Sequence, residues 1–232
     1  PNDDPRVNFL YDELQKINKK LVSYNSSLKV YHGNPLEVFK QLSKENPELK
    51  VYANRDYEPY AIARDEEINK LLLENGSELI STKDQVIFEK NEVVKNDGLP
   101  YTVFTPFKNK WLAKFKEEGF HLELKLNSEN FNKSNHDFPS MEELGFKKSS
   151  IKVPSFSLDR VHNYEETRNF PSLDSTSKIG PHLRFGTVSI REIVSKVKDL
   201  NDTYLSELVW REFFMQILWH FPKVVHENFR PK

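Results

Sequence analysis

The spacing of apolar residues predicts helices over much of the first half of the chain. Residues 2–23 carry apolar side chains every three or four positions, which is the period of an α-helix. Asp4 followed by Pro5 is a typical start for that helix, because Asp caps the first turn and Pro suits the first helical position. Two further helices are predicted over residues 34–42 and 57–75.

Short apolar runs between these helices predict strands at residues 28–31, 49–52, 79–80 and 86–88. Strands that alternate with helices form a parallel sheet. The first helix has no strand before it, although a β-α-β unit needs one, so we expect at least one N-terminal strand to be missing. Another helix, with Thr105 and Pro106 as its cap and first residue, is expected to carry Phe107 and Trp111.

The second half is predicted to be helical behind a connector. Periodicity is lost at 119–158, a stretch rich in Ser, Asn and Lys, and it returns afterwards with helices over 189–197 and 202–221. The predicted fold class is therefore α/β followed by all-α. We place an incomplete α/β domain at 1–118 and an incomplete helical domain at 159–232, joined by the connector.

Composition allows a folded core and gives no global sign of a nucleic-acid binder. Of 232 residues 37% are hydrophobic, and 34 Lys and Arg against 35 Asp and Glu leave a net charge of -1. The absence of Cys excludes disulfides, Cys-bound metals and thiol catalysis, and it is compatible with a reducing cytoplasm. No run is apolar enough to span a membrane, and the His residues lack metal spacing. We therefore expect a cytoplasmic protein without a metal.

Two patterns in the second half carry candidate chemistry. Thr176 and Ser177 are expected at a helix start, where hydroxyls and unpaired N–H groups bind anions, although ordinary capping is the commoner use. Glu207, Trp210 and Arg211 are expected on one face of a helix that is apolar almost all round. On spacing alone, an ion pair between Glu207 and Arg211 with Trp210 in the core is the favoured interpretation. The alternative is that the charged pair lines a cavity.

Several segments occur along the chain in an order known from one protein family. They are residues 54–60 with 64–65, 101–107, 164–171, 175–186 and 207–214. Together they resemble the DNA photolyase and cryptochrome flavoproteins, most closely the bacterial class I cyclobutane pyrimidine dimer photolyases. The resemblance covers nearly all of the chain. It implies a Rossmann-like antenna domain, incomplete here, followed by the first part of a helical FAD-binding domain.

The resemblance also implies light-dependent DNA repair by a monomer. In that family, light excites reduced FAD, which donates an electron to a flipped-out thymine dimer in DNA and recovers it once the cyclobutane ring has split. The implied cofactor-binding residues are Tyr164, Thr176, Ser177, Lys178, Ile179, Gly180, Glu207 and Arg211. The implied catalytic residues are Trp210, which stacks on the dimer, Glu207, which hydrogen-bonds it, and Arg211, which lies near flavin and lesion. We expect both sets to frame one cavity.

The sequence departs from the family pattern at several positions. Gly180 stands where many relatives have Ser, which removes one hydroxyl from the phosphate pocket, and Ser175 stands where many have Gly. Some relatives bind a light-harvesting pterin through an Asn–Glu pair, whose positions are here Tyr60 and Ala61. A deazaflavin, another antenna or none is therefore open. The family's C-terminal flavin motifs are absent, so we expect this chain alone to bind FAD weakly or not at all.

Three other functions stay open. They are a cryptochrome-type blue-light photoreceptor, a six-four photolyase, and a flavin-free nucleotide-binding or interaction module built on the α/β half. Glu207 and Trp210 favour repair over signalling. The sequence contains neither a glycine-rich phosphate loop nor a Gly-x-Ser-x-Gly nucleophile motif, which makes hydrolase and metalloenzyme functions poor interpretations.

Overall fold

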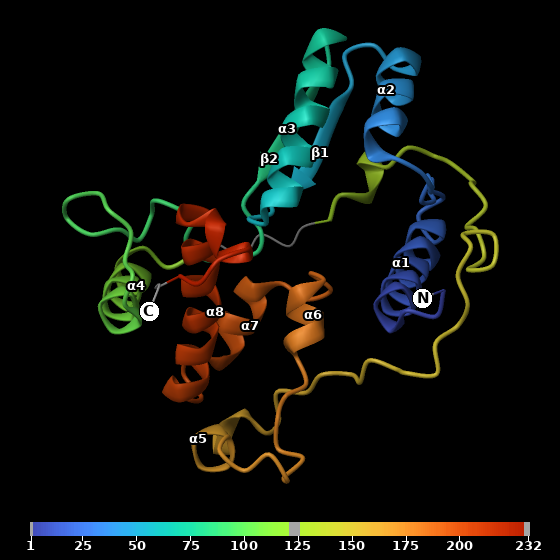
Figure 1. Cartoon of the computed structure of the whole chain (residues 1–232). Coiled ribbons are helices and arrows are strands. Elements are labelled where there is room, and N and C mark those ends of the chain that lie inside the picture. The colour runs from blue at the N-terminus through green and yellow to red at the C-terminus, as the bar shows by residue number, and fades with distance from the viewer. Residues whose placement is uncertain (1, 121–125, 230–232) are drawn as a thin grey trace. The chain divides into compact units, whose positions relative to one another are not determined.

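The computed structural model describes residues 2–120 and 126–229. The chain divides into two compact units, each assembled from separate segments (coloured along the chain in Figure 1). The first unit consists of Pro1–Asn34, Glu123–Phe156 and Lys178–Thr187, and the second of Pro35–Leu122, Ser157–Ser177 and Val188–Lys232. These units divide the chain by contacts rather than by function, so the boundaries proposed at 118 and 158 remain a prediction.

Helix α1 (Pro5–Val22) dominates the first unit and begins as predicted. The side chain of Asp4 accepts a hydrogen bond of 2.8 Å from the Arg6 backbone N–H, and Pro5 occupies the first helical position. The buried Asn8 accepts a 3.0 Å bond from the backbone N–H of Ser149, which ties α1 to a segment far along the sequence. This unit also contains the 3-10 turn η1 (Ser128–Asn130) and the short helix α6 (Gly180–Arg184).

The second unit contains a two-stranded parallel sheet. Strand β1 (Lys50–Asn54) pairs with β2 (Glu78–Thr82) in a register that runs from Lys50 opposite Glu78 to Asn54 opposite Thr82. Helix α3 (Pro59–Glu74) connects the two strands and also packs against helix α2 (Pro35–Glu45). Gly76, with a φ of 69°, turns the chain from α3 into β2, as its left-handed conformation favours glycine. The predicted helix–strand alternation is confirmed here.

Two of the four predicted strands do not form. Residues 28–31 lie in the first unit, where no described segment is a strand with which they could pair. Residues 86–88 lie in the second unit, but the N–H groups of Ile87 and Phe88 donate to the side chain of Glu212 instead of to a strand. A short apolar run becomes a strand only where a neighbouring backbone takes its hydrogen bonds, and sequence pattern cannot show that neighbour.

Helices make up the rest of the second unit. Their bounds are α4 (Phe104–Glu118), η2 (Val161–Asn163), α5 (Tyr164–Thr167), α7 (Ile190–Val197), α8 (Asp202–His220) and η3 (Pro222–Val225). The predicted start of α4 at Thr105 and Pro106 is wrong, because Val103 is the N-cap and Pro106 lies within the first turn. Pro is tolerated there since first-turn N–H groups have no partner within the helix. Phe107 and Trp111 are buried as expected.

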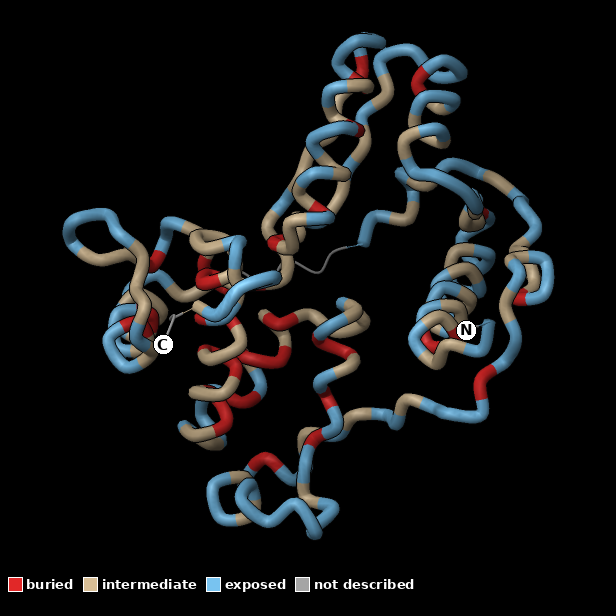
Figure 2. Tube along the Cα trace, in the orientation of Figure 1, coloured by how far each residue is buried: buried red, intermediate tan, exposed pale blue. Residues whose placement is uncertain are grey.

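The core of the second unit lies along α8. Buried positions concentrate on this helix, on α7 and on the inner side of α4 (red in Figure 2). Asn201 caps α8, its side chain accepting a 2.9 Å bond from the backbone N–H of Tyr204. The predicted fold class of α/β elements followed by helices is confirmed. Among the helices that the structure describes, none is both long and apolar enough to cross a membrane.

Candidate functional site around helix α8

A hydroxyl cluster lies against the first turn of α8. The hydroxyl groups of Ser177 and Tyr204 are 2.9 Å apart, and both residues are buried. The ring of Tyr164, from α5, meets Tyr204 edge to face at 5.0 Å, and the guanidinium of Arg168 lies 5.4 Å from the Tyr164 ring. Burial raises the pKa of both tyrosines, so their hydroxyls stay protonated and able to donate. Hydroxyl donors beside an arginine suit an anionic phosphate.

The two predicted hydroxyl residues are not at a helix start. Helix α6 begins only at Gly180, with Ile179 as its N-cap, so Thr176 and Ser177 precede it. Thr176 is exposed, and Lys178 adopts a left-handed conformation with a φ of 57°. The chain is not helical here, and the hydroxyl of Ser177 pairs with Tyr204 of α8 rather than capping a helix. Lys178, Ile179 and Gly180 belong to the first unit, whereas the cluster belongs to the second.

Glu207 lies one turn beyond Tyr204 and forms an ion pair with Arg168, the residue that follows α5. Its carboxylate is 2.5 Å from Nη1 of Arg168, and both side chains are about one-third exposed. The sequence suggested Arg211 as the partner, but the guanidinium of Arg211 donates a 2.7 Å hydrogen bond to the backbone carbonyl of Gln85. Arg168 belongs to the segment 164–171, which carries part of the family resemblance, but no role was predicted for it. Its distance of 39 residues from Glu207 hid the pairing from any local pattern.

Trp210 is half-buried and stacks on an aromatic ring from α4. Its ring centroid lies 3.5 Å from that of Phe104 at an interplanar angle of 10°, and 5.4 Å from that of the exposed Phe214. Six residues separate Trp210 from Tyr204, which corresponds to about 9 Å along a helix and about 120° around it. The hydroxyl cluster and the indole therefore occupy different faces of α8, with Glu207 between them.

Glu212 was not predicted, and it is the most buried charged residue in the part of the chain that the structure describes. It is 2% exposed, and its carboxylate accepts hydrogen bonds from the backbone N–H groups of Ile87 (2.7 Å) and Phe88 (3.0 Å) and from Nε1 of Trp111 (2.7 Å). Burial raises its pKa to about 7, while these donors and the charge of Arg211 oppose that rise. The one sequence signal was its spacing of four from Gln216 and then from His220, a polar stripe on an apolar helix.

We expect Glu212 to make the protein more stable at pH 5 than at pH 8. Its folded pKa of about 7 exceeds the usual 4.5, so the native state takes up the proton first as pH falls. The stabilisation is complete below the unfolded pKa and is lost as pH rises through 7, and it amounts to about 3 kcal/mol. Urea unfolding at both pH values should show this difference for the wild type relative to Glu212→Gln. Parallel pH dependences for the two proteins would contradict it.

A small cavity lies against α3 and β2 and reaches the residues that follow the carboxyl end of β1. It has a volume of about 190 Å³ and is lined by residues that include Arg55, Asp65, Lys90 and Trp219. Arg55 pairs with Glu89, and the Lys90 ammonium lies 3.8 Å from the centre of the Trp219 ring. Of the two positions that replace the pterin ligands, Tyr60 is exposed and Ala61 is buried. The cavity is smaller than the 300 Å³ or so of a typical ligand site.

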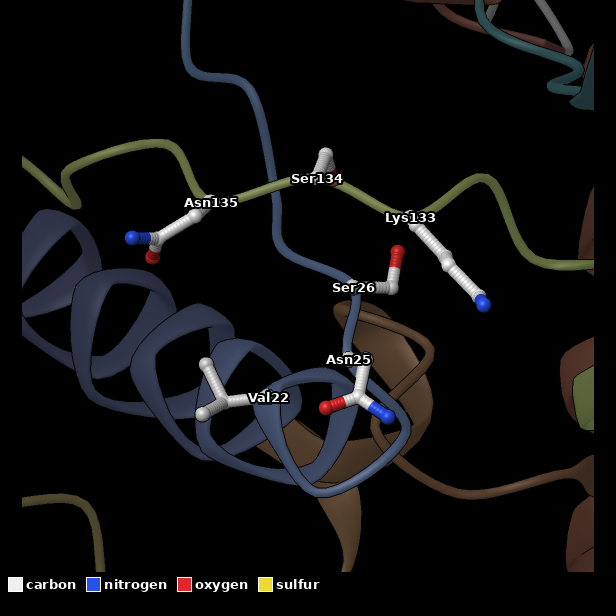
Figure 3. A pocket seen from close by; sticks show the side chains of 6 residues that line it. All are labelled: Val22, Asn25, Ser26, Lys133, Ser134 and Asn135. Atoms are coloured by element: carbon white, nitrogen blue, oxygen red, sulfur yellow. The ribbon is translucent and has the colours of Figure 1, made fainter.

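Another cavity, of about 410 Å³, lies in the first unit between the end of α1 and residues 133–135 (Figure 3). The hydroxyl of the buried Ser26 points toward the segment that carries Lys133 and Ser134. None of the predicted site residues lines this cavity. In the described ranges, no three His, Asp or Glu side chains are grouped so that they could hold a metal ion.

The fold agrees with comparisons to known proteins. The model of the DNA photolyase family matches residues 2–125, which is more than half of the chain, so the chain belongs to the DNA photolyase family. Deoxyribodipyrimidine photo-lyase from Halobacterium salinarum is 30% identical over 97% of this chain and 53% of its own length. This chain therefore spans about half the length of such relatives. The resemblance inferred from the motif order is confirmed at the level of the family.

Solved structures show the same fold. A bacterial class III photolyase from Agrobacterium tumefaciens covers 99% of this chain with a TM-score of 0.74 at 23% identity, and the match spans 53% of that protein. An archaeal photolyase from Sulfolobus tokodaii covers 98% with a TM-score of 0.72 at 25% identity, spanning 51% of that protein. The latter structure contains two FAD molecules, with the implication of a novel light-harvesting cofactor in that enzyme.

Proposed function

We propose that this protein splits cyclobutane pyrimidine dimers in DNA with light, using FAD as its cofactor. One observation carries the proposal. Within a single unit of a photolyase-family chain, α8 carries Glu207 between a hydroxyl cluster at its first turn and the half-buried Trp210 on another face. An aromatic platform, a carboxylate and phosphate-type donors along and against one helix are what a flipped base pair and a dinucleotide cofactor require.

The donor set of the hydroxyl cluster fits the diphosphate of FAD. Ser177, Tyr164 and Tyr204 supply hydroxyl donors, and Arg168 supplies a positive charge within the same cluster. Thr176, which is exposed next to Ser177, adds a further hydroxyl. FAD, when bound and reduced, supplies the electron that light excites and accepts it again after the ring has split. The chain's residues bind and orient the cofactor and the lesion.

Trp210 and Glu207 are proposed to hold the lesion. A flipped pyrimidine dimer would stack on the indole of Trp210, whose ring already lies 3.5 Å from that of Phe104 and 5.4 Å from that of the exposed Phe214. Aromatic faces stack on bases without sequence preference. The Glu207 carboxylate is one-third exposed, so it can exchange part of its contact with Arg168 for a hydrogen bond to the base edge. Arg211 is proposed to lie near flavin and lesion, and its guanidinium donates a hydrogen bond to the backbone carbonyl of Gln85.

We further propose that the protein acts as a monomer in the cytoplasm, with DNA that contains pyrimidine dimers as its partner. A second chromophore is left to experiment, because the pterin positions carry Tyr60 and Ala61 and the nearby cavity is small. The boundaries at 1–118, 119–158 and 159–232 are proposed as the antenna domain, the connector and the helical domain.

The test is light-dependent repair by the intact protein. We expect an oligonucleotide with one thymine dimer to be restored under blue light and left unchanged in the dark, and the visible spectrum to show flavin. A matched oligonucleotide with a six-four lesion separates the two photolyase activities. A yellow protein that repairs neither lesion would indicate a cryptochrome-type photoreceptor. A colourless protein after gentle purification would favour the flavin-free module and overturn the proposal.

A further inference from the structure

The proposed function makes no use of Glu212, although this residue joins three parts of the second unit. Its buried carboxylate accepts hydrogen bonds from two consecutive backbone N–H groups, those of Ile87 and Phe88, and from the indole N–H of Trp111. Burying a carboxylate is costly unless donors surround it. A group retained at that cost, two positions from Trp210, invites a functional explanation.

Neighbouring side chains of α8 hold the same backbone segment. Gln216 donates a 3.1 Å bond to the Phe88 carbonyl, and Nε2 of His220 lies 2.8 Å from the Lys90 carbonyl oxygen. Together with the bond from Arg211 to Gln85, these contacts fix residues 85–90 to α8 by side chains. These hydrogen bonds therefore restrain both the rotation of α8 about its axis and its shift along that axis relative to residues 85–90.

The third bond of Glu212 carries this restraint to α4. Trp111 and Phe104 are seven residues apart on α4, which is close to two helical turns, so both side chains face the same direction. Trp111 is 1% exposed and is held by Glu212, while Phe104 lies flat against Trp210 at 3.5 Å. Anchoring Trp111 therefore also sets where the Phe104 ring lies relative to the indole.

We propose that Glu212 is a positioning residue for lesion binding, which holds α4 through Trp111 so that Phe104 keeps the indole of Trp210 in a fixed plane. The inference rests on the proposed function, because it assumes that Trp210 stacks on the lesion. An indole already fixed in its bound orientation loses no rotational freedom when a base stacks on it. Glu212 acts through these neighbours and has no contact with the reacting atoms, so its effect falls on binding rather than on the light-driven step.

The experiment compares Glu212→Gln and Trp111→Phe with the wild type in the intact protein. Glutamine has the same shape but turns an amide N–H₂ toward the donors, whereas phenylalanine removes the indole donor and part of the buried ring. The matched control is Glu192→Gln, whose glutamate is an exposed partner of Lys196 on α7. The readouts are the dissociation constant of a thymine-dimer oligonucleotide, the repair rate at saturating DNA, and the near-ultraviolet circular dichroism assigned to Trp210 by difference against Trp210→Phe.

We expect Glu212→Gln to weaken lesion binding about tenfold and Trp111→Phe about threefold, because part of the stacking energy is lost. The repair rate at saturating DNA should stay within about twofold, since the bound complex is reached in the same geometry. The dichroism of Trp210 should decrease in both variants, and the control should match the wild type in every readout. A purely structural role would lower the folded fraction without separating binding from rate.

Several outcomes would overturn the inference. One is a folded Glu212→Gln protein that binds the lesion as the wild type does. If that variant does not fold, an unchanged dissociation constant for Trp111→Phe is equally decisive. If the wild type itself neither binds nor repairs the lesion, the proposed function fails together with the role in lesion binding. The dichroism then still reports whether Glu212 fixes the Trp210 stack, so the two failures are distinguishable.

Discussion

Replacing Trp210 with alanine should weaken binding of a thymine-dimer oligonucleotide by roughly 10- to 100-fold, because base–aromatic stacking contributes about 1–3 kcal/mol per base. The variant loses the indole surface on which the base is proposed to stack, while the Phe104 ring behind it remains. Repair at low DNA concentration should fall by the same factor. Fluorescence anisotropy with damaged and undamaged oligonucleotides measures the binding, and illumination assays measure the repair.

Two control variants sharpen this expectation. Trp210→Phe should recover most of the affinity, because a smaller aromatic face still stacks. Tyr52→Ala removes an aromatic side chain that is 69% exposed on β1, far along the chain from α8, and should leave binding unchanged. An affinity loss of equal size for damaged and undamaged DNA would show that Trp210 does not contact the lesion. Unchanged affinity in Trp210→Ala would remove the main support for repair at this site.

Glu212→Ala should lower the free energy of unfolding at pH 7 by about 3 kcal/mol or more. The substitution leaves the N–H groups of Ile87, Phe88 and Trp111 buried without an acceptor, and each unsatisfied donor costs about 1–3 kcal/mol. The lost desolvation penalty of the carboxylate offsets part of that sum. Urea-induced unfolding followed by circular dichroism and by tryptophan fluorescence measures the change.

The control for stability is Glu192→Ala. The carboxylate of Glu192 accepts a hydrogen bond from Lys196 on the same helix, and both side chains are about half exposed. The free energy of unfolding should therefore fall by less than about 1 kcal/mol in this variant. Coincident curves from the two probes support a two-state comparison. If Glu212→Ala were no less stable than Glu192→Ala, water or a backbone shift would have to satisfy the donors. The interpretation of Glu212 as a structural anchor would then be wrong.

Local sequence patterns predicted the elements whose stability depends on their own residues. The helix behind Asp4 and Pro5 forms because its cap and first turn are encoded within a few positions. The α8 helix forms over nearly the predicted range because its propensity and its apolar surface agree. The order of motifs along the chain also indicated the photolyase family, which the family model confirms.

The strands show where local pattern fails. Residues 49–52 and 86–88 have similar apolar runs, yet only the first forms a strand, because β2 pairs with it. The other run is held by the side chain of Glu212, which comes more than 120 residues later. Similarly, Ser177 was expected to cap a helix but pairs with Tyr204. In each case the deciding hydrogen-bond partner is distant in the sequence.

The sequence by itself determined the helices, the alternation of the α/β half, the family and the identities of Glu207 and Trp210 as candidate residues. Only the tertiary structure decided which charges meet. In the folded protein Glu207 pairs with Arg168 rather than with a residue of its own helix. The carboxylate that is buried on α8 is that of Glu212. The physical reason is that α8 is apolar almost all round, so its period cannot show which carboxylate faces water. That depends on which donors α4 and residues 85–90 bring to each side.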